Sequence, residues 1–205
     1  MRVFRKLLAA EWSRLRDHLL RLSPADRHCR FAGHVGEDTV ARYCRTIPWL
    51  STVVVGWFED GVLRGAAECR WLGPARPRTV ELAVTVEHPW QDQGIGSELV
   101  SRALTIARNR GVVSVFMLCL TDNRAMQAIV RKHAGDLRYA DGDVEATIAI
   151  PFPTNVSMLQ EAMADWTGAT GALWWRMLQQ WQQAAGKSAA AAGVRGGLPA
   201  PANLG

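Results

Sequence analysis

Apolar residues recur at helical spacing near the start of the chain. Between residues 8 and 22 they fall three or four positions apart, which places them in one stripe on a helix of about four turns. A second helix is predicted to begin at Ser23, a good capping residue, with Pro24 in its first turn. A third, short helix is predicted over residues 39–46. The stripe of the first helix consists of Leu8, Trp12, Leu15, Leu19 and Leu22.

The middle of the chain is rich in β-branched and aromatic residues instead. Residues 51–59 and 62–72 are predicted to form a hairpin, because Asp60-Gly61 between them is typical of a tight turn. Another strand is predicted over residues 79–86. The nearly continuous apolar run at 112–120 indicates a central strand that is covered on both faces.

Helical spacing returns in the second half of the chain. It predicts one helix over residues 97–110, which ends at Gly111, and another over residues 123–133. Two further strands are expected at 137–140 and 143–150, on either side of Asp141-Gly142.

A boundary is predicted at Pro151-Phe152-Pro153. Residues 155–183 again show helical spacing, and Gly168 and Gly171 are expected to divide this stretch into two helices. From Gly186 onward the chain is mostly Ala, Gly and Pro, which offer too little bulky apolar surface to offset the entropy of ordering. The predicted organisation is a folded domain at 1–152, a helical extension at 153–185 and a disordered tail at 186–205.

Composition narrows the class of protein. A chain of 205 residues with 48% hydrophobic and 21% charged residues can bury a stable core without disulfide bonds or structural metal ions. The net charge of +5 is spread along the chain and forms no basic cluster with interleaved aromatics, so we expect no nucleic-acid partner. No apolar run approaches the roughly 18 residues that span a bilayer, and Glu11 and Arg14 interrupt the apolar N-terminus too early for a signal peptide. We therefore expect no membrane association and a cytoplasmic protein.

The cysteines are far apart in the sequence. Cys29, Cys44, Cys69 and Cys119 form no C-x-x-C pair, which argues against a disulfide framework and against a zinc site. We expect reduced thiols and no bound metal.

The most informative stretch is the turn Gln91–Ser97, which joins the strand at 79–86 to the following helix. A glycine-rich turn at a helix start presents unpaired N–H groups and the positive end of the helix dipole, a favourable site for phosphate. The dinucleotide fingerprint does not fit, because Leu99 stands where its third glycine is required, and no Gly-Lys-Ser/Thr triplet is present. An ordinary tight turn with two glycines remains the alternative.

Three motifs together resemble the GNAT superfamily of N-acetyltransferases. The first is Q-x-x-G-x-G at Gln91–Gly96, and the second is Asn123-Arg124-Ala125-Met126, similar to the N-x-x-A or N-x-x-M helix start of the family. The third is Leu22–Phe31, similar to the L-S-P-E-S-R-x-x-R-F segment of a branch that includes bacterial protein-lysine acetyltransferases. The resemblance covers residues 19–150. It implies an α/β (α+β) fold with a mixed, mostly antiparallel twisted sheet of six to seven strands flanked by helices.

The resemblance also implies acetyl-CoA as the cosubstrate. The N–H groups of residues 93–97 would hold its pyrophosphate, and the backbone of residues 83–86 would pair with its pantetheine arm as an added strand. Asn123 would bind near the pantetheine. The residues expected to bind acetyl-CoA are Val84, Thr85, Val86, Gln91, Asp92, Gln93, Gly94, Ile95, Gly96, Ser97 and Asn123.

The implied reaction is transfer of the acetyl group to a primary amine by direct attack, through a tetrahedral intermediate. Glu81 matches the position of a glutamate in that branch, ten residues before Gln91, and is the candidate base. An exposed polar residue in an alternating strand is the alternative interpretation of Glu81. The oxyanion would be held by a backbone N–H near Val84. Many family members have a tyrosine seven residues after the Asn, but here that position is Val130, which cannot donate a proton.

Two questions about function and partners stay open at this level. The missing tyrosine favours an alternative function, a non-catalytic acyl-CoA sensor or interaction module. The acceptor amine could belong to a small molecule or to a protein lysine. The C-terminal region contains Trp174, Trp175 and Trp181, which are most simply core residues or a docking face. If they have a functional role, we expect a homodimer interface or a wall of the acceptor pocket.

Overall fold

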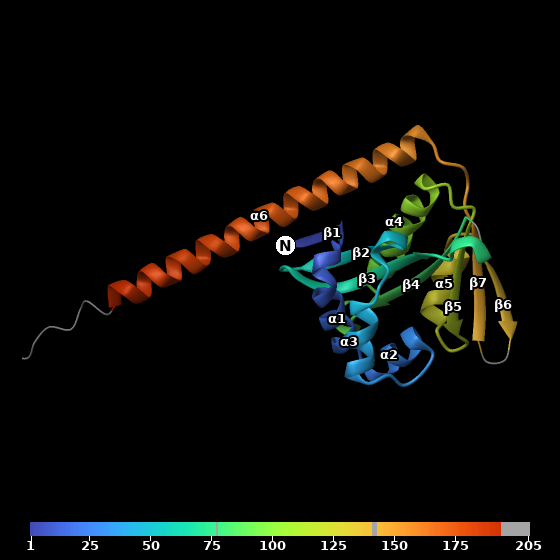
Figure 1. The fold of residues 1–205 in the computed structure, drawn as a ribbon, viewed down its shortest axis with the longest axis horizontal. Coiled ribbons are helices and arrows are strands. Elements are labelled where there is room, and N and C mark those ends of the chain that lie inside the picture. The colour runs from blue at the N-terminus through green and yellow to red at the C-terminus, as the bar shows by residue number, and fades with distance from the viewer. Residues whose placement is uncertain (77, 141–142, 194–205) are drawn as a thin grey trace, which may run out of the picture.

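Seven strands in one sheet carry the fold, with helices on both of its faces and a long helix at the C-terminal end (Figure 1). The computed structural model describes residues 1–76, 78–140 and 143–193. In chain order the elements are β1 (Arg2–Lys6), α1 (Trp12–Arg21), α2 (Pro24–Phe31), α3 (Glu37–Arg45), β2 (Thr52–Glu59), β3 (Val62–Trp71), β4 (Thr79–Val86), α4 (Ile95–Asn109), β5 (Ser114–Leu120), α5 (Arg124–Lys132), β6 (Asp136–Ala140), β7 (Asp143–Ala149) and α6 (Asn155–Gly193).

The strands follow the spatial order β1-β2-β3-β4-β5-β7-β6. Every neighbouring pair is antiparallel except β4 and β5, which are parallel. A parallel pair needs a crossover connection, and α4 provides it. The structure therefore confirms the predicted mixed, mostly antiparallel sheet with flanking helices.

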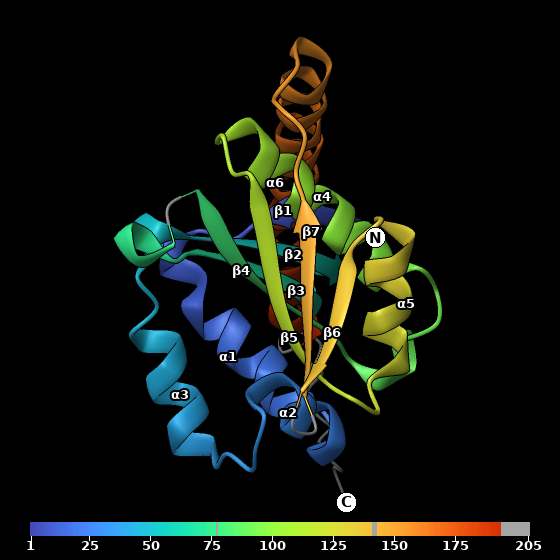
Figure 2. The same cartoon turned by 90° about the vertical axis from the view of Figure 1, so that its right-hand side faces the viewer.

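Each face of the sheet has its own hydrophobic core (Figure 2). On one face, Leu99, Val100 and Ala103 of α4 pack on Val80 and Leu82 of β4. On the other face, helices α1 and α3 pack on strands β2 and β3. That second core includes Leu15, Leu19, Val40, Cys44, Val54, Phe58 and Leu63, none of them more than 2% exposed.

Several local predictions are confirmed. Asp60 and Gly61 have φ angles of 49° and 76°, as a hairpin turn with two left-handed central residues requires. The Ser23 side chain accepts a hydrogen bond from the backbone N–H of Asp26, so it caps α2 as expected. The strands predicted after residue 136 are β6 and β7, and the turn residues 141–142 lie outside the described residues.

The N-terminal prediction was wrong in one respect. Residues 2–6 form the edge strand β1, which pairs with β2 from Arg2 opposite Glu59 to Lys6 opposite Val55. The first helix accordingly begins only at Trp12, and Leu8 is an exposed residue outside it. Charged residues protect an edge strand from pairing with other chains, and here they obscure its alternating pattern in the sequence.

The C-terminal prediction also needs correction. The structure has a single helix, α6, in place of two, and it continues through residues 186–193, which were expected to be disordered. The alanines of this stretch have the highest helix propensity of all residues. Gly168 serves close packing, because a Cβ there would lie 2.8 Å from the Cβ of Arg5. Residues 194–205 of the predicted tail lie outside the described residues. Within the described part of the chain, no helix combines the length and apolarity that crossing a bilayer requires.

Candidate functional site

The two parallel strands separate to form a groove. β4 and β5 are paired only from Thr79 opposite Ser114 to Glu81 opposite Phe116. Beyond that point β4 continues to pair with β3, and β5 with β7, while their facing edges diverge. The resulting groove has a volume of about 640 Å³ and is lined by α2, β4, β5, α5 and the turn before α4. This volume is in the range of ordinary small-molecule sites.

The edge of β4 that faces the groove has free backbone groups. The N–H of Glu87 donates to the carbonyl oxygen of Arg64 at 2.9 Å, so Glu87 turns its backbone toward β3. Successive residues of a strand turn their backbone groups to opposite sides. The N–H and C=O groups of Val84 therefore face the groove, and those of Thr85 face β3. An extended ligand can add to this edge as a further strand.

The predicted phosphate turn has the geometry that such a site requires. Gly94 caps α4 with a φ of 79°, and the first hydrogen bond of the helix runs from the N–H of Glu98 to the carbonyl oxygen of Gly94 at 3.0 Å. The N–H groups of Ile95, Gly96 and Ser97 thus have no acceptor within the helix. Gly94, Gly96 and Ser97 line the groove. An anion at this position would meet free donors and the positive end of the dipole.

The amides of the two glutamines in this turn have partners within the protein. Gln91 Nε2 donates to the Val86 carbonyl oxygen and to Asp26 Oδ1, both at 3.0 Å. Gln93 Nε2 donates to the carbonyl oxygen of Pro89 at 3.1 Å. Gln91 therefore ties the turn to β4 and to α2. This link, between residues 65 positions apart, could not be read from the sequence.

Asn123 lines the groove at the start of α5. It is the N-cap of that helix, and its Oδ1 accepts a hydrogen bond from the Met126 N–H at 3.1 Å. The asparagine in the N-x-x-M motif thus has a structural role as a cap. Its side-chain NH₂ has no acceptor among the described residues.

Glu81 lies at the closed end of the groove, where β4 and β5 are still paired. It is half-buried and is not one of the residues that line the groove. Its neighbours Val80 and Leu82 belong to the core under α4, so Glu81 lies on the opposite face of the sheet, as Ala83 and Thr85 do. Among the predicted site residues, the structure brings together the turn, the edge of β4 and Asn123, and it places Glu81 beside them.

The position at which many family members have a tyrosine lies in the hydrophobic core of this protein. Val130 is fully buried against α4 and β7. The two tyrosine hydroxyls are engaged elsewhere: Tyr43 donates to Glu68 and Tyr139 to Gln127. In the described part of the chain, no tyrosine lines the groove.

A buried ion pair next to the groove escaped the sequence analysis. Glu68 on β3 is 4% exposed and accepts hydrogen bonds from Arg30 at 2.6 Å and from the Tyr43 hydroxyl at 2.9 Å. Burial, together with the charge of Glu68, raises the pKa of Tyr43 above its usual range. Arg30 also lines the groove, while Tyr43 and Glu68 line a smaller cavity on the α3 side, so this cluster contributes to the walls of both.

A second buried cluster supports the end of β4. His18 on α1 is fully buried; its Nδ1 lies 3.1 Å from Glu87 Oε1 and its Nε2 lies 2.9 Å from Thr85 Oγ1. Because a carboxylate only accepts, Nδ1 carries the proton and Nε2 accepts from Thr85. Burial lowers the pKa of His18 despite the nearby Glu87, so the ring is neutral. Glu87 also binds Arg21 and Arg64, each at 2.9 Å, and these bonds hold its pKa below the usual range against the effect of burial.

Because of this cluster, we expect the fold to lose stability as the pH falls. Below pH 6.5, the ordinary pKa of histidine, the unfolded chain binds a proton at residue 18 and the folded chain does not. The free energy of unfolding then falls by about 1.4 kcal/mol per pH unit for as long as folded His18 stays neutral. Urea unfolding at pH 7.5 and 5.5 measures the change.

The variant His18→Gln isolates this contribution. Between the two pH values its free energy of unfolding should fall by about 1 kcal/mol less than that of the wild type. The free energy of unfolding of His34→Gln, at an exposed histidine, should fall as much as that of the wild type. An equal loss in all three proteins would show that His18 is already charged in the folded state.

The cysteines of this chain are unpaired, and two of them line the groove. Cys29 on α2 and Cys119 on β5 lie on its walls, and burial raises the pKa of both thiols. They are therefore poor nucleophiles at neutral pH. Among the described residues, no group of three histidine, cysteine or acidic side chains is arranged to hold a metal ion.

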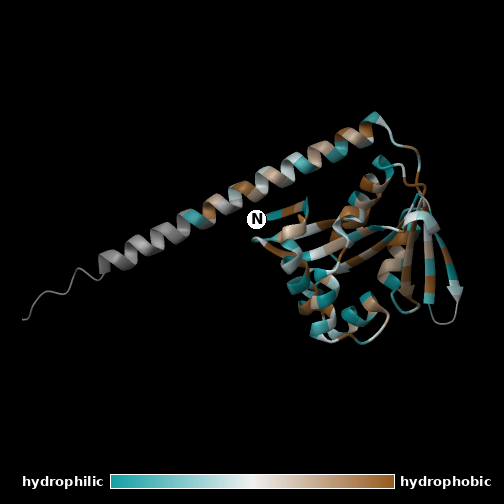
Figure 3. Cartoon of the chain, in the orientation of Figure 1, coloured by the Kyte–Doolittle hydropathy of each residue, from teal (hydrophilic) through white to brown (hydrophobic). Residues whose placement is uncertain are grey.

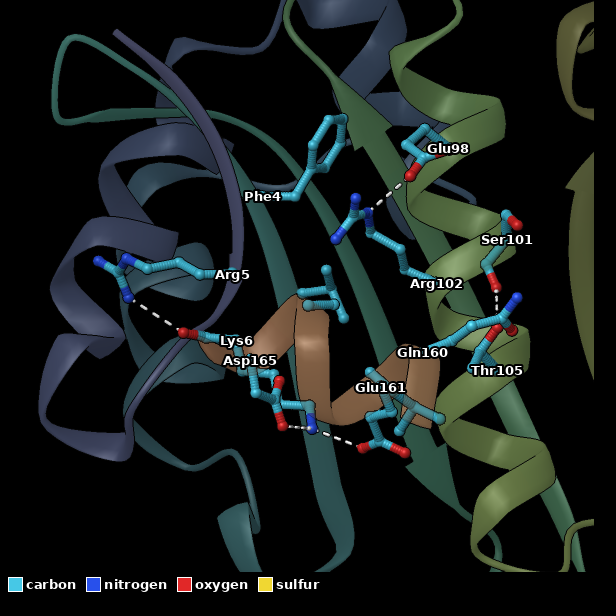
Figure 4. A pocket seen from close by; sticks show the side chains of 13 residues that line it. Phe4, Arg5, Lys6, Glu98, Ser101, Arg102, Thr105, Gln160, Glu161 and Asp165 are labelled. Carbon is cyan, nitrogen blue, oxygen red and sulfur yellow. Dashed lines mark hydrogen bonds and ion pairs between the residues drawn. The ribbon is translucent and has the colours of Figure 1, made fainter. Parts of the chain in front are cut away.

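A separate cavity of about 220 Å³ lies between β1, α4 and α6 (Figure 4). Lys6 lines this cavity, and its Nζ binds Glu161 Oε1 at 2.5 Å and Asp165 Oδ2 at 2.7 Å. Arg102 is likewise paired, with Glu98 at 2.7 Å. The ion pairs of Lys6 thus join α6 to β1.

Comparisons with known proteins match this architecture. Residues 12–135 match the sequence profile of the family described as the acetyltransferase (GNAT) family. An acetyltransferase of Pseudomonas aeruginosa is 29% identical over 133 residues, which cover 61% of this chain and 69% of that protein.

Solved structures show the same fold. The GNAT domain of S. lividans PAT superposes with a TM-score of 0.62 at 18% identity, over 72% of this chain and 89% of that one. An acetyltransferase from Salmonella typhimurium, solved with acetyl-CoA, gives a TM-score of 0.59 at 18% identity, over 75% of this chain and 96% of that one. At this identity the likeness concerns the fold alone.

Proposed function

Since the chain belongs to the GNAT family of acetyltransferases, we propose that it transfers the acetyl group of acetyl-CoA to a primary amine by direct attack. The observation that carries the proposal is the arrangement of free backbone groups around one groove. The N–H groups at the start of α4 and the unpaired edge of β4 both face it. The first set suits a pyrophosphate, and the second suits the amide chain of pantetheine.

The residues present fit such a ligand. Gly96 leaves room at the mouth of the groove, since a Cβ there would meet only Ile129 and Val86, at 3.5 and 3.8 Å. Asn123 supplies an uncommitted NH₂ group on the facing wall. Apart from the backbone, that wall consists largely of apolar side chains such as Met117 and Ile129, which exclude water from a thioester.

Glu81 is the proposed base. A lysine-like amine has a pKa of about 10.4, so presenting it in neutral form at pH 7 costs about 4.6 kcal/mol. Glu81 would accept the proton of the attacking amine, directly or through one water, as the bond from nitrogen to the acetyl carbon forms. Its place at the closed end of the groove, outside the cosubstrate walls, suits a group that acts on the acceptor.

The remaining steps need little from other side chains. The N–H of Val84 faces the groove and would stabilise the oxyanion of the tetrahedral intermediate. As the carbon–sulfur bond breaks, the thiolate leaves and takes its proton from water. Neither tyrosine hydroxyl lies on the groove walls, so a tyrosine acid is not part of this proposal.

We propose that the acceptor enters through a small cavity on the α3 side of the sheet. It has a volume of about 100 Å³ and is walled by Tyr43, Thr52, Glu68 and Arg70. Arg70 lies opposite Glu81 in the sheet, so the cavity opens on the face that carries the proposed base. Thr52 Oγ1 is buried in this region without a hydrogen-bond partner. Glu68 is already bonded to Arg30 and Tyr43, so the Thr52 hydroxyl is the free acceptor that this cavity would offer to an amine, either of a small molecule or of a protein lysine.

Lys132 is expected to contribute to cosubstrate affinity. Its Nζ binds Ser97 Oγ at 2.9 Å, which places a positive charge beside the N-terminus of α4. We predict that Lys132→Gln weakens CoA binding about three- to fivefold, as removal of one exposed charge pair does, and makes binding less sensitive to salt. Calorimetric titration at two salt concentrations measures both effects. Arg131→Gln, at the preceding residue, should leave them unchanged, and equal effects of the two substitutions would contradict a specific role of Lys132.

The proposed function itself is tested by turnover. Purified protein with acetyl-CoA and a panel of polyamines, amino acids and lysine peptides should release free CoA thiol in proportion to acetylated amine. Binding of acetyl-CoA without turnover on any acceptor would instead support the non-catalytic sensor. Absence of both binding and turnover would contradict the assignment of the groove.

A further inference from the structure

Helix α6 packs on its own domain with a side that is small and polar. Gly168 and Gly171 face β1, where a Cβ would lie 2.8 Å from Arg5 and 3.1 Å from Met1 respectively. Ser157 bonds Asn109 of α4, and Glu161 bonds both Asn109 and Lys6. Hydrogen bonds, ion pairs and close backbone contact therefore hold α6 to the domain.

The large apolar side chains of α6 face away from the domain. Leu159, Met163, Trp166, Leu173 and Met177 occupy positions that alternate by four and three residues, with Thr170 in the gap, as in one seam of a two-stranded coiled coil. On a helix of 3.6 residues per turn they fall within a stripe of roughly 140°, and Gly168 lies on the opposite side of the helix. This seam, which is 38 to 73% exposed, consists of Leu159, Met163, Trp166, Leu173, Trp174, Met177 and Leu178.

This arrangement reverses that of an ordinary surface helix, whose apolar stripe faces its own core. Figure 3 shows apolar segments recurring along α6, and Figure 1 shows the helix continuing past the sheet. Over residues 178–193 the helix extends away from the domain. A seam of this kind in water indicates a partner.

The chemistry of the seam identifies the kind of partner. Between residues 155 and 178 the charged residues are Glu161, Asp165 and Arg176, and both carboxylates bind Lys6 of their own chain. None of the seven seam residues is itself charged. The seam is complementary to an apolar seam of the same spacing, and a second copy of α6 carries one.

The area is also sufficient. Seven large side chains that each lose on the order of 100 Å² would bury about 700 Å² per chain, close to the ~800 Å² that each partner contributes to a stable interface. No described residue of α6 lines the groove proposed for acetyl-CoA.

We propose that this chain forms a homodimer in which the seams of two α6 helices pack against each other. Of the two uses considered for the C-terminal tryptophans, this assigns the dimer interface to Trp174. The side chains of Trp175 and Trp181 lie outside the described residues.

Light scattering coupled to size-exclusion chromatography of the full chain tests the proposal. The wild type should have twice the chain mass of 22.6 kDa at micromolar concentration. The double variant Trp166→Gln/Leu173→Gln removes two central seam residues, which are 73% and 60% exposed, and should raise the dissociation constant at least about tenfold. Ala169→Gln, at an exposed position beside the seam, is the matched control and should stay dimeric.

Three outcomes would overturn the proposal: a wild type that is monomeric at every concentration, a double variant that remains as dimeric as the wild type, or a monomer that co-sediments with phosphatidylcholine/phosphatidylglycerol vesicles through the same seam. Circular dichroism of each variant establishes that the fold is retained. Acetyl-CoA affinity should be equal in all variants, so failure of this proposal leaves the proposed function intact.

Discussion

Replacing Gly96 by tryptophan should abolish CoA binding. The Cβ position of residue 96 lies in ordinary contact distance of Ile129 and Val86, so any larger side chain must extend into the groove between α5 and β4. The indole would occupy the space above the free N–H groups of α4 and exclude the pyrophosphate. We expect the dissociation constant, measured by calorimetry, to rise by at least about 100-fold, or 2.7 kcal/mol.

Gly96→Ala is the control for this substitution. An added methyl group at 3.5 and 3.8 Å from its neighbours fits without rearrangement, so the alanine variant should fold and bind CoA within a few-fold of the wild type. Thermal unfolding of both variants separates loss of the site from loss of the fold. A folded tryptophan variant with unchanged CoA affinity would mean that the ligand does not use this turn.

Replacing Glu81 by glutamine should abolish turnover while leaving binding intact. The amide keeps the size of the side chain but cannot accept the proton of the attacking amine, and general-base contributions amount to about 10²- to 10⁴-fold in kcat. Because Glu81 lies outside the groove walls, the CoA dissociation constant should not change. Steady-state kinetics with CoA titration on the same sample measures both quantities.

A matched control variant strengthens this test. Glu145→Gln, an exposed carboxylate of β7, serves as the matched control with normal kcat. Normal turnover of the Glu81 variant would remove Glu81 from the mechanism and leave the groove assignment standing.

The parts of this protein that the sequence predicts are those determined by neighbouring residues. The turn before α4 depends on glycines at fixed positions next to a strand and a helix, and it has the expected geometry. The cap at Ser23 and the hairpin at Asp60-Gly61 are equally local. Each of these features is recognised because a few adjacent residues determine the backbone angles.

The features missed by sequence reasoning depend on contacts between distant residues. Strand β1 exists because it pairs with β2, about fifty residues away along the chain. The His18–Thr85 and Arg30–Glu68 contacts join helices to strands across the chain, and each side chain alone resembles an ordinary surface residue. Gly168 was interpreted as a helix break because local propensity cannot show that a neighbouring strand requires the missing side chain.

The functional predictions differ in the same way, depending on whether they rest on neighbouring or on distant residues. The cosubstrate groove could be predicted because it is built mainly from backbone and glycine. The role of Glu81 is still a prediction, because a base is defined by its position relative to an acceptor that the sequence does not specify. The cavity proposed for the acceptor is bounded by α3, β2 and β3, and its walls come together only in the fold.

Hydrogen–deuterium exchange with and without CoA tests the central claim most directly, because the claim concerns main-chain amides. CoA should slow exchange of the amides in residues 82–86 and 94–97, with little change along α6. Exchange that is unchanged in both segments, or protection confined to the cavity between β1, α4 and α6, would contradict the account.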